Sequence, residues 1–206
     1  MFDARLRPLI DPPLAWMAKG LVRYRISANQ VTVLGAVPGF AAAVCIGFEL
    51  YLAGLVLILV NRLSDGLDGA VARQTRATDF GGYLDIVLDF LFYAAIPLGF
   101  AAAQPDVNAL PAAVLIASFI GTGSSFLAYA VVAAKRDIST DIRGKKSFYH
   151  LGGLTEGTET IAFLVLCCLL PGHFPVLAYG FAALCCITTV TRIVAAYQNF
   201  TDGDAG

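Results

Sequence analysis

Four aspartates stand at regular short spacings in a part of the sequence that is otherwise rich in apolar residues. Asp65 and Asp68 are three residues apart, and Asp85 and Asp89 are four apart. Residues at these spacings share one face of a helix. Carboxylates near a hydrocarbon layer are costly, so such residues usually have a function. If the two helices bring these pairs together, four negative charges converge, and they require protonation or bound cations.

The same four residues are candidate metal ligands. Two divalent cations would neutralise four carboxylates, and hard oxygen ligands suit magnesium or manganese. We therefore expect two Mg²⁺ or Mn²⁺ ions at Asp65, Asp68, Asp85 and Asp89.

The composition indicates the elements that must position these acids. The chain has 206 residues, 58% of them hydrophobic, and a mean hydropathy of +0.73. A soluble domain of this size rarely reaches such values. Most of the apolar stretches approach the ~20 residues that a spanning helix needs. The fold predicted is an all-α membrane protein with six transmembrane helices, which include Val31–Tyr51, Leu52–Leu63, Phe80–Ala103, Leu110–Ala134, Gly157–Leu170 and Phe174–Gln198.

Basic residues are confined to alternate connections of this six-span map. None occurs in the connections near Glu49, Gln104–Asn108 and Pro171–Pro175. Basic loops of inner-membrane proteins face the cytoplasm. The map therefore predicts a multi-pass protein of the cytoplasmic membrane with both termini and the aspartates on the cytoplasmic side. The basic segments are the N-terminal segment, Arg62–Arg76, Lys135–Lys146 and Arg192.

A further helix is expected before the first span. Asp11 followed by Pro12 and Pro13 is typical of a helix start, and Trp16 lies among alternating apolar and basic residues. This pattern predicts an amphipathic interfacial helix; a cytoplasmic helix packed on the bundle is the alternative. We interpret 1–206 as one domain, with a juxtamembrane segment (1–28), a six-helix bundle (29–198) and a cytoplasmic tail (199–206).

The aspartate segment resembles the signature of the CDP-alcohol phosphotransferase (CDP-alcohol phosphatidyltransferase) family, D-x-x-D-G-x-x-A-R followed by G-x-x-x-D-x-x-x-D. Seven residues separate Arg73 from Gly81, where the family usually has eight, and we interpret this as a shortened loop. All eight signature positions are matched, by Asp65, Asp68, Gly69, Ala72, Arg73, Gly81, Asp85 and Asp89.

The resemblance implies a reaction and a role for each signature residue. A phosphatidyl group passes from CDP-diacylglycerol to the hydroxyl of a small polar alcohol, and CMP leaves. Asp65, Asp68 and Asp85 are then metal ligands, and Asp89 completes the metal site and acts as the general base. Gly69, Ala72 and Arg73 bind the cytidine diphosphate; Arg73 suits this role because a guanidinium can grip a phosphate bidentately. The resemblance also implies a homodimer.

The acceptor alcohol is left open by the sequence. A basic loop containing Arg143, Lys145 and Lys146 favours an anionic acceptor such as glycerol 3-phosphate, although such a loop also serves as a lipid-headgroup anchor. Serine or inositol (phosphate) are the alternatives. Glu156 and Glu159 suit the first turn of a helix and could instead form a polar rim of the acceptor site.

Two other classes of protein also place acids in a membrane. A cation transporter is disfavoured, because the acids lie at one end of the spans and no pair of broken helices recurs in two halves. A non-catalytic membrane scaffold is disfavoured by the intact signature. No nucleic-acid partner is expected.

Overall fold

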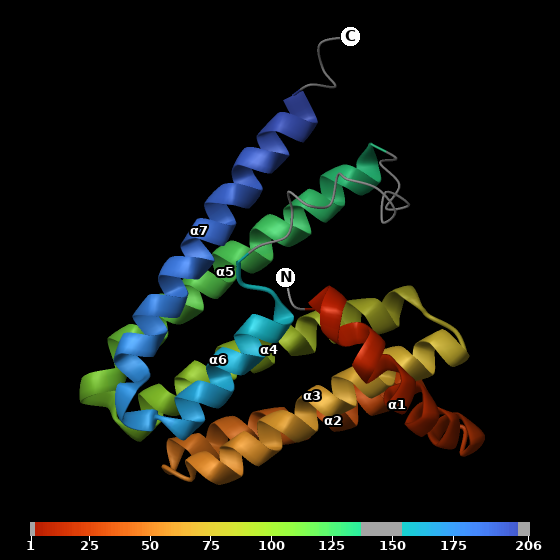
Figure 1. The fold of residues 1–206 in the computed structure, drawn as a ribbon, viewed down its shortest axis with the longest axis horizontal. Coiled ribbons are helices and arrows are strands. Elements are labelled where there is room, and N and C mark those ends of the chain that lie inside the picture. The colour runs from red at the N-terminus through yellow and green to blue at the C-terminus, as the bar shows by residue number, and fades with distance from the viewer. Residues whose placement is uncertain (1–2, 137–153, 202–206) are drawn as a thin grey trace.

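The computed structural model describes residues 3–136 and 154–201, and these residues form helices and no strands. In Figure 1 the long helices α5 and α7 lie on one side, and α1, α2, α3 and α4 pack together in the N-terminal half. In chain order the elements are α1 (Asp3–Arg23), α2 (Ala28–Gly47), α3 (Tyr51–Gln74), α4 (Asp79–Ala103), α5 (Pro105–Lys135), α6 (Gly157–Leu169), the short 3₁₀ helix η3 (Pro171–His173) and α7 (Phe174–Thr201).

Helix α2 packs along both helices that carry the aspartates. Its start is fixed by Ser27, which exchanges hydrogen bonds with Gln30 in a capping box. A Cβ placed at Gly39 would lie 2.9 Å from Asn61 Nδ2 on α3 and 3.0 Å from the Phe92 ring on α4. The absence of a side chain there lets α2 approach both neighbours. Helices α3 and α4 have few direct contacts with each other. Their packing on α2 is therefore what brings the acids together.

Aromatic side chains tie the C-terminal helices to this cluster. The Phe100 ring on α4 stacks on Phe174 of α7 with centroids 4.4 Å apart, and Phe163 on α6 stacks on Phe181 at 4.2 Å. Helices α5 and α7 lie side by side along most of their length (Figure 1). This packing fixes α4, and with it Asp85 and Asp89, relative to the second half of the chain.

Helix α1 packs on α3 beside the aspartate motif. Leu14 and Ala18 are buried against Ala70 and Val71. These contacts agree with the alternative of a helix packed on the bundle. The sequence-based start at Asp11 was wrong, since α1 begins at Asp3. The two prolines remove backbone donors without ending the helix, because the contacts with α3 offset their cost.

Four helices are long and apolar enough to cross a membrane: α2, α4, α5 and the segment Pro171–Thr201. Five of the six predicted stretches form helices whose bounds lie within five residues of those expected, whereas the second, Leu52–Leu63, continues as helix through the aspartate motif to Gln74. Helix α3 carries the charged motif, and α6 has only 13 residues, which is short for a bilayer core of about 30 Å. The structure thus supports a multi-span all-helical protein with four clear candidate spans among the described residues.

The close packing of α2 on α4 generates a stability prediction. A Cβ at Gly99 would lie 2.5 Å from the backbone oxygen of Ala43, so Gly99→Ala must push the two helices apart. We expect a loss of ~1–3 kcal/mol in stability, typical of overpacking, seen as a lower thermal midpoint of the purified protein. Gly180→Ala is the matched control, because a Cβ there meets nothing within 4 Å. Equal midpoints for the two variants would contradict this account of the α2–α4 contact.

Candidate active site

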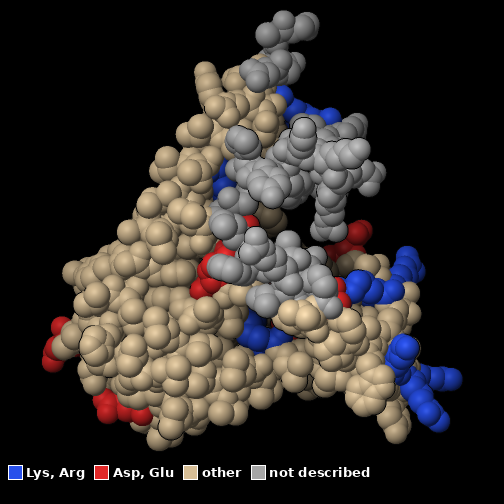
Figure 2. All heavy atoms as spheres, in the orientation of Figure 1, with Lys and Arg blue, Asp and Glu red and all other residues tan. Residues whose placement is uncertain are grey.

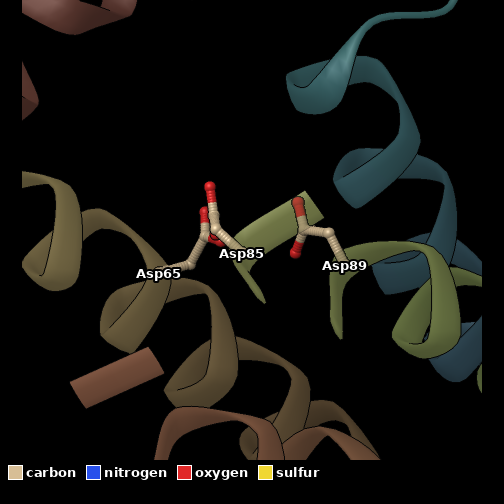
Figure 3. Close-up of side chains that lie close together, drawn as sticks. All are labelled: Asp65, Asp85 and Asp89. Carbon is tan, nitrogen blue, oxygen red and sulfur yellow. The ribbon is translucent and has the colours of Figure 1, made fainter. Parts of the chain in front are cut away.

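Three of the four aspartates form a tight group. One carboxylate oxygen from each of Asp65, Asp85 and Asp89 lies within 4.8 Å of the others. Asp65 comes from α3 and the other two come from successive turns of α4, and all three side chains extend toward the same space (Figure 3). The predicted convergence of the two helical pairs therefore occurs for these three residues.

Asp68 lies beside this group, one turn along α3 from Asp65. It is only 7% exposed, and its Oδ2 atom has no hydrogen-bond partner among the described residues. A buried carboxylate oxygen without a partner is costly. Asp68 lines the same hollow as the other three acids, so a cation or a polar substrate group in this hollow could satisfy it.

An arginine that the sequence analysis did not select also enters the hollow. Arg62 Nη2 lies 2.7 Å from Asp89 Oδ1, and its Nη1 lies 3.7 Å from Asp65 Oδ2. Its guanidinium stacks over the Phe92 ring at 4.4 Å. The signal was present in the sequence: an arginine within an apolar stretch, three residues before Asp65, is expensive unless it is paired.

A second, larger hollow of about 170 Å³ adjoins the first. It is lined by the signature residues Gly69, Ala72 and Gly81, and also by Gly82 and Arg76. The two hollows share Thr32, Asp68 and Asp85. An elongated ligand in the second hollow would therefore reach the acids at one of its ends.

Arg73 sits at the edge of the second hollow and does not line it. Its Nη2 lies 3.9 Å from Asp11 of α1, and both side chains are largely exposed, so the ion pair is weak. Its Nη1 lies 3.3 Å from the position of a Cβ at Gly69. The glycine therefore leaves room for the guanidinium above the motif. Arg76, which the sequence analysis placed in a basic segment but did not select as a site residue, lines the hollow.

The donor set fits a hard divalent cation. Three converging carboxylates and the unpartnered Oδ2 of Asp68 offer only oxygen ligands, which are the ligands that magnesium and manganese prefer. Such residues could hold a metal ion between α3 and α4. Arg62 supplies part of the positive charge that this acidic group requires.

A second polar cluster lies between the C-terminal helices. Arg192 on α7 donates from Nη1 to the Thr122 backbone oxygen at 2.9 Å, and its buried Nε has no hydrogen-bond partner among the described residues. Glu156 caps α6, Glu159 lies in its first turn, and Glu156 interacts electrostatically with Arg192. The predicted basic loop residues Arg143, Lys145 and Lys146 lie outside the described residues.

The fold is shared with a solved enzyme structure. The phosphatidylinositol phosphate synthase of Mycobacterium tuberculosis with CDP-DAG bound matches with a TM-score of 0.66 over 89% of this chain and 93% of that chain, at 23% identity. The same enzyme with manganese and citrate matches with a TM-score of 0.64 at 22% identity, over 89% of this chain and 88% of that one. At these identities the similarity establishes the fold alone.

Sequence relatives identify the family. The inner membrane protein YnjF of Escherichia coli is 51% identical over 197 residues, or 96% of each chain. The archaetidylinositol phosphate synthase of Pyrococcus horikoshii is 36% identical over 104 residues, which are 48% of this chain and 53% of that protein. The family profile described as CDP-alcohol phosphatidyltransferase matches residues 25–191. This chain therefore belongs to the CDP-alcohol phosphatidyltransferase family.

Proposed function

We propose that this protein transfers a phosphatidyl group from CDP-diacylglycerol to a hydroxyl group of an inositol phosphate and releases CMP. The observation that carries the proposal is the pair of adjoining hollows. One holds the acids, the other is lined by signature residues and is large enough for part of a nucleotide, and they share Asp68 and Asp85. A diphosphate that spans both hollows would present its phosphorus to the acids.

The cytidine diphosphate is proposed to lie over the second hollow. Gly69 and Ala72 line it, and small residues there leave space for a pyrophosphate. Arg73, at its edge, and Arg76, in its lining, are permanent cations that can pair with phosphate oxygens. The structure of a family member with CDP-DAG bound supports CDP-diacylglycerol as the donor.

Asp89 is proposed as the general base. It lines the first hollow and not the second, so it lies away from the proposed nucleotide position, on the side from which an acceptor would attack. The acceptor oxygen forms a bond to phosphorus, the bond from phosphorus to the CMP oxygen breaks, and the hydroxyl proton moves to the Asp89 carboxylate. Arg62 fixes the direction of that carboxylate by its 2.7 Å contact.

Two Mg²⁺ or Mn²⁺ ions are the proposed cofactors, with Asp65, Asp68, Asp85 and Asp89 as ligands. Bound ions would stabilise the charge on the phosphate oxygens and on the departing CMP. The donor set supports this proposal, as does the manganese complex of the related fold.

The relatives change the expected acceptor. An archaetidylinositol phosphate synthase and a phosphatidylinositol phosphate synthase are among the similar proteins, and they favour inositol phosphate over the glycerol 3-phosphate that the basic loop suggested. Arg192 supports an anionic acceptor, because its unpartnered Nε is a buried donor in the second polar cluster. Phe119, one turn from Thr122, packs against Tyr93, one turn from Asp89, with ring centroids 6.2 Å apart. This contact joins α4, which carries Asp89, to α5, whose Thr122 backbone oxygen accepts from Arg192.

The protein is proposed to lie in the inner membrane with α2 to α7 as six spans, both termini in the cytoplasm and the acids at the cytoplasmic face. The related inner membrane protein supports the location. In Figure 2 several Lys and Arg side chains lie on the α1 side, others lie in the centre and toward the far ends of α5 and α7, and none is visible at the end where α2 meets α3. A homodimer remains part of this proposal through family resemblance.

The orientation can be tested with reporters fused after Glu49, Gln104 and Gly172. The first two lie close together, since Gln104 Nε2 is 3.5 Å from Glu49 Oε1. We expect all three reporters to be outside, because their connections lack basic residues. Fusions after Arg25 and Thr75 are the controls and should be inside. A cytoplasmic signal from any of the first three would contradict the six-span orientation.

The acceptor can be identified with purified protein, CDP-diacylglycerol and magnesium. CMP release should require inositol phosphate, while glycerol 3-phosphate, serine and inositol should give little. Release of CMP with glycerol 3-phosphate and not with inositol phosphate would contradict the proposed acceptor.

The same assay tests the requirement for metal ions. Chelation should abolish CMP release, and added magnesium or manganese should restore it. Full CMP release in excess chelator would show that the reaction does not need the metal ions.

Asp89→Asn keeps the shape of the side chain and one oxygen while it removes the base. Turnover should fall by about 10²–10⁴-fold, the range of general-base contributions. Binding of CDP-diacylglycerol in the presence of magnesium separates the two proposed roles. Near-normal binding supports Asp89 as base, whereas loss of both binding and turnover makes it chiefly a ligand.

Asp79→Asn, in the exposed first turn of α4, is the matched control and should leave turnover unchanged. Wild-type turnover by Asp89→Asn would refute the assignment.

A further inference from the structure

Arg62 is the only cation among the described residues that line the acidic hollow. It contacts Asp89 at 2.7 Å and Asp65 at 3.7 Å. These two residues are also members of the proposed metal-ligand set. The guanidinium therefore occupies coordination space that a divalent ion would need.

The position of Arg62 is fixed by neighbours on three helices. Its Nε and Nη2 donate to Asn61 Oδ1 at 2.9 and 2.6 Å, and Asn61 Nδ2 donates to the Gly35 backbone oxygen of α2 at 2.7 Å. On the α4 side its guanidinium lies 4.4 Å from the Phe92 ring centroid and 5.4 Å from that of Tyr93. An arginine held in this way keeps its charge at the acids, in contrast to a mobile surface side chain.

The charges of the centre do not balance when Arg62 and two divalent ions are all in place. Four carboxylates match two divalent ions, so one additional guanidinium leaves the centre with excess positive charge. Like charges a few ångströms apart repel strongly at a partly buried site. The second ion must therefore bind despite repulsion from the Arg62 guanidinium, or it must displace that guanidinium from Asp89.

We propose that Arg62 is a built-in cation that holds the metal-free acids together and competes with the second divalent ion for Asp89. This inference rests on the proposed two-ion function. It makes Arg62 a positioning residue, because it acts through Asp89 and sets how tightly the centre retains its second metal ion.

The test is a titration of the purified protein with Mn²⁺, in which free Mn²⁺ is followed by electron paramagnetic resonance. Wild-type protein should bind one ion tightly and a second more weakly. Arg62→Met removes the charge and retains an apolar chain against Phe92. It should tighten the weaker site by about tenfold or more, the scale on which neighbours of metal ligands act. A gain in affinity cannot arise from damage to the fold.

Two variants control for charge and for arginine removal in general. Arg62→Lys keeps the positive charge and should stay within about threefold of wild type. Arg136→Met removes an arginine that also stacks on an aromatic ring, Phe200 at 5.4 Å, away from the acids, and it should leave Mn²⁺ binding unchanged. Arg62→Gln provides a second charge-removing variant with the same expected gain should the methionine variant fold poorly.

The outcomes separate this inference from the proposed function. Unchanged or weaker Mn²⁺ binding by both charge-removing variants, with normal binding by wild type, would overturn the competition and leave the metal centre intact. Absence of Mn²⁺ binding by wild type would remove the metal centre itself, and the inference with it.

Discussion

Repulsion among four aspartates at the edge of an apolar bundle is the constraint on which the arrangement of this protein depends. Charges in such surroundings are stable only when opposite charge or hydrogen-bond donors lie close by. Arg62 contacts Asp89 and Asp65, whereas the buried Oδ2 of Asp68 has no partner among the described residues. The centre is thus partly neutralised by the protein, and the remaining negative charge suits it to cations.

Helix α2 determines how the acids are arranged in space. It carries no acid of the signature, but it packs against both helices that do. Gly39 allows the close approach to Asn61 and Phe92, and the Gly35 backbone oxygen holds Asn61, which in turn holds Arg62. The position of the acidic group therefore depends on two glycines of α2, which carries none of the acids, and on the amide of Asn61 on α3.

The two polar regions of the protein lie in different halves of the chain. The signature residues lie on α3 and α4, and both hollows are lined by α2, α3, α4 and the α3–α4 connection. Arg192 and Glu156 belong to the second half, which reaches α4 through the contact of Phe119 with Tyr93.

The sequence by itself determined the helical membrane class, the helical segments and the signature residues, because apolar length, basic loops and aspartate spacing are local properties. It could not separate Asp68 from the tight group of three, show that Arg73 does not line the second hollow, or show that Arg62 enters the centre. Those facts depend on how closely α2 approaches α3 and α4. That approach is set by side-chain volumes at contacts far apart in the chain, such as Gly99 against Ala43, and only the tertiary structure brings such residues together.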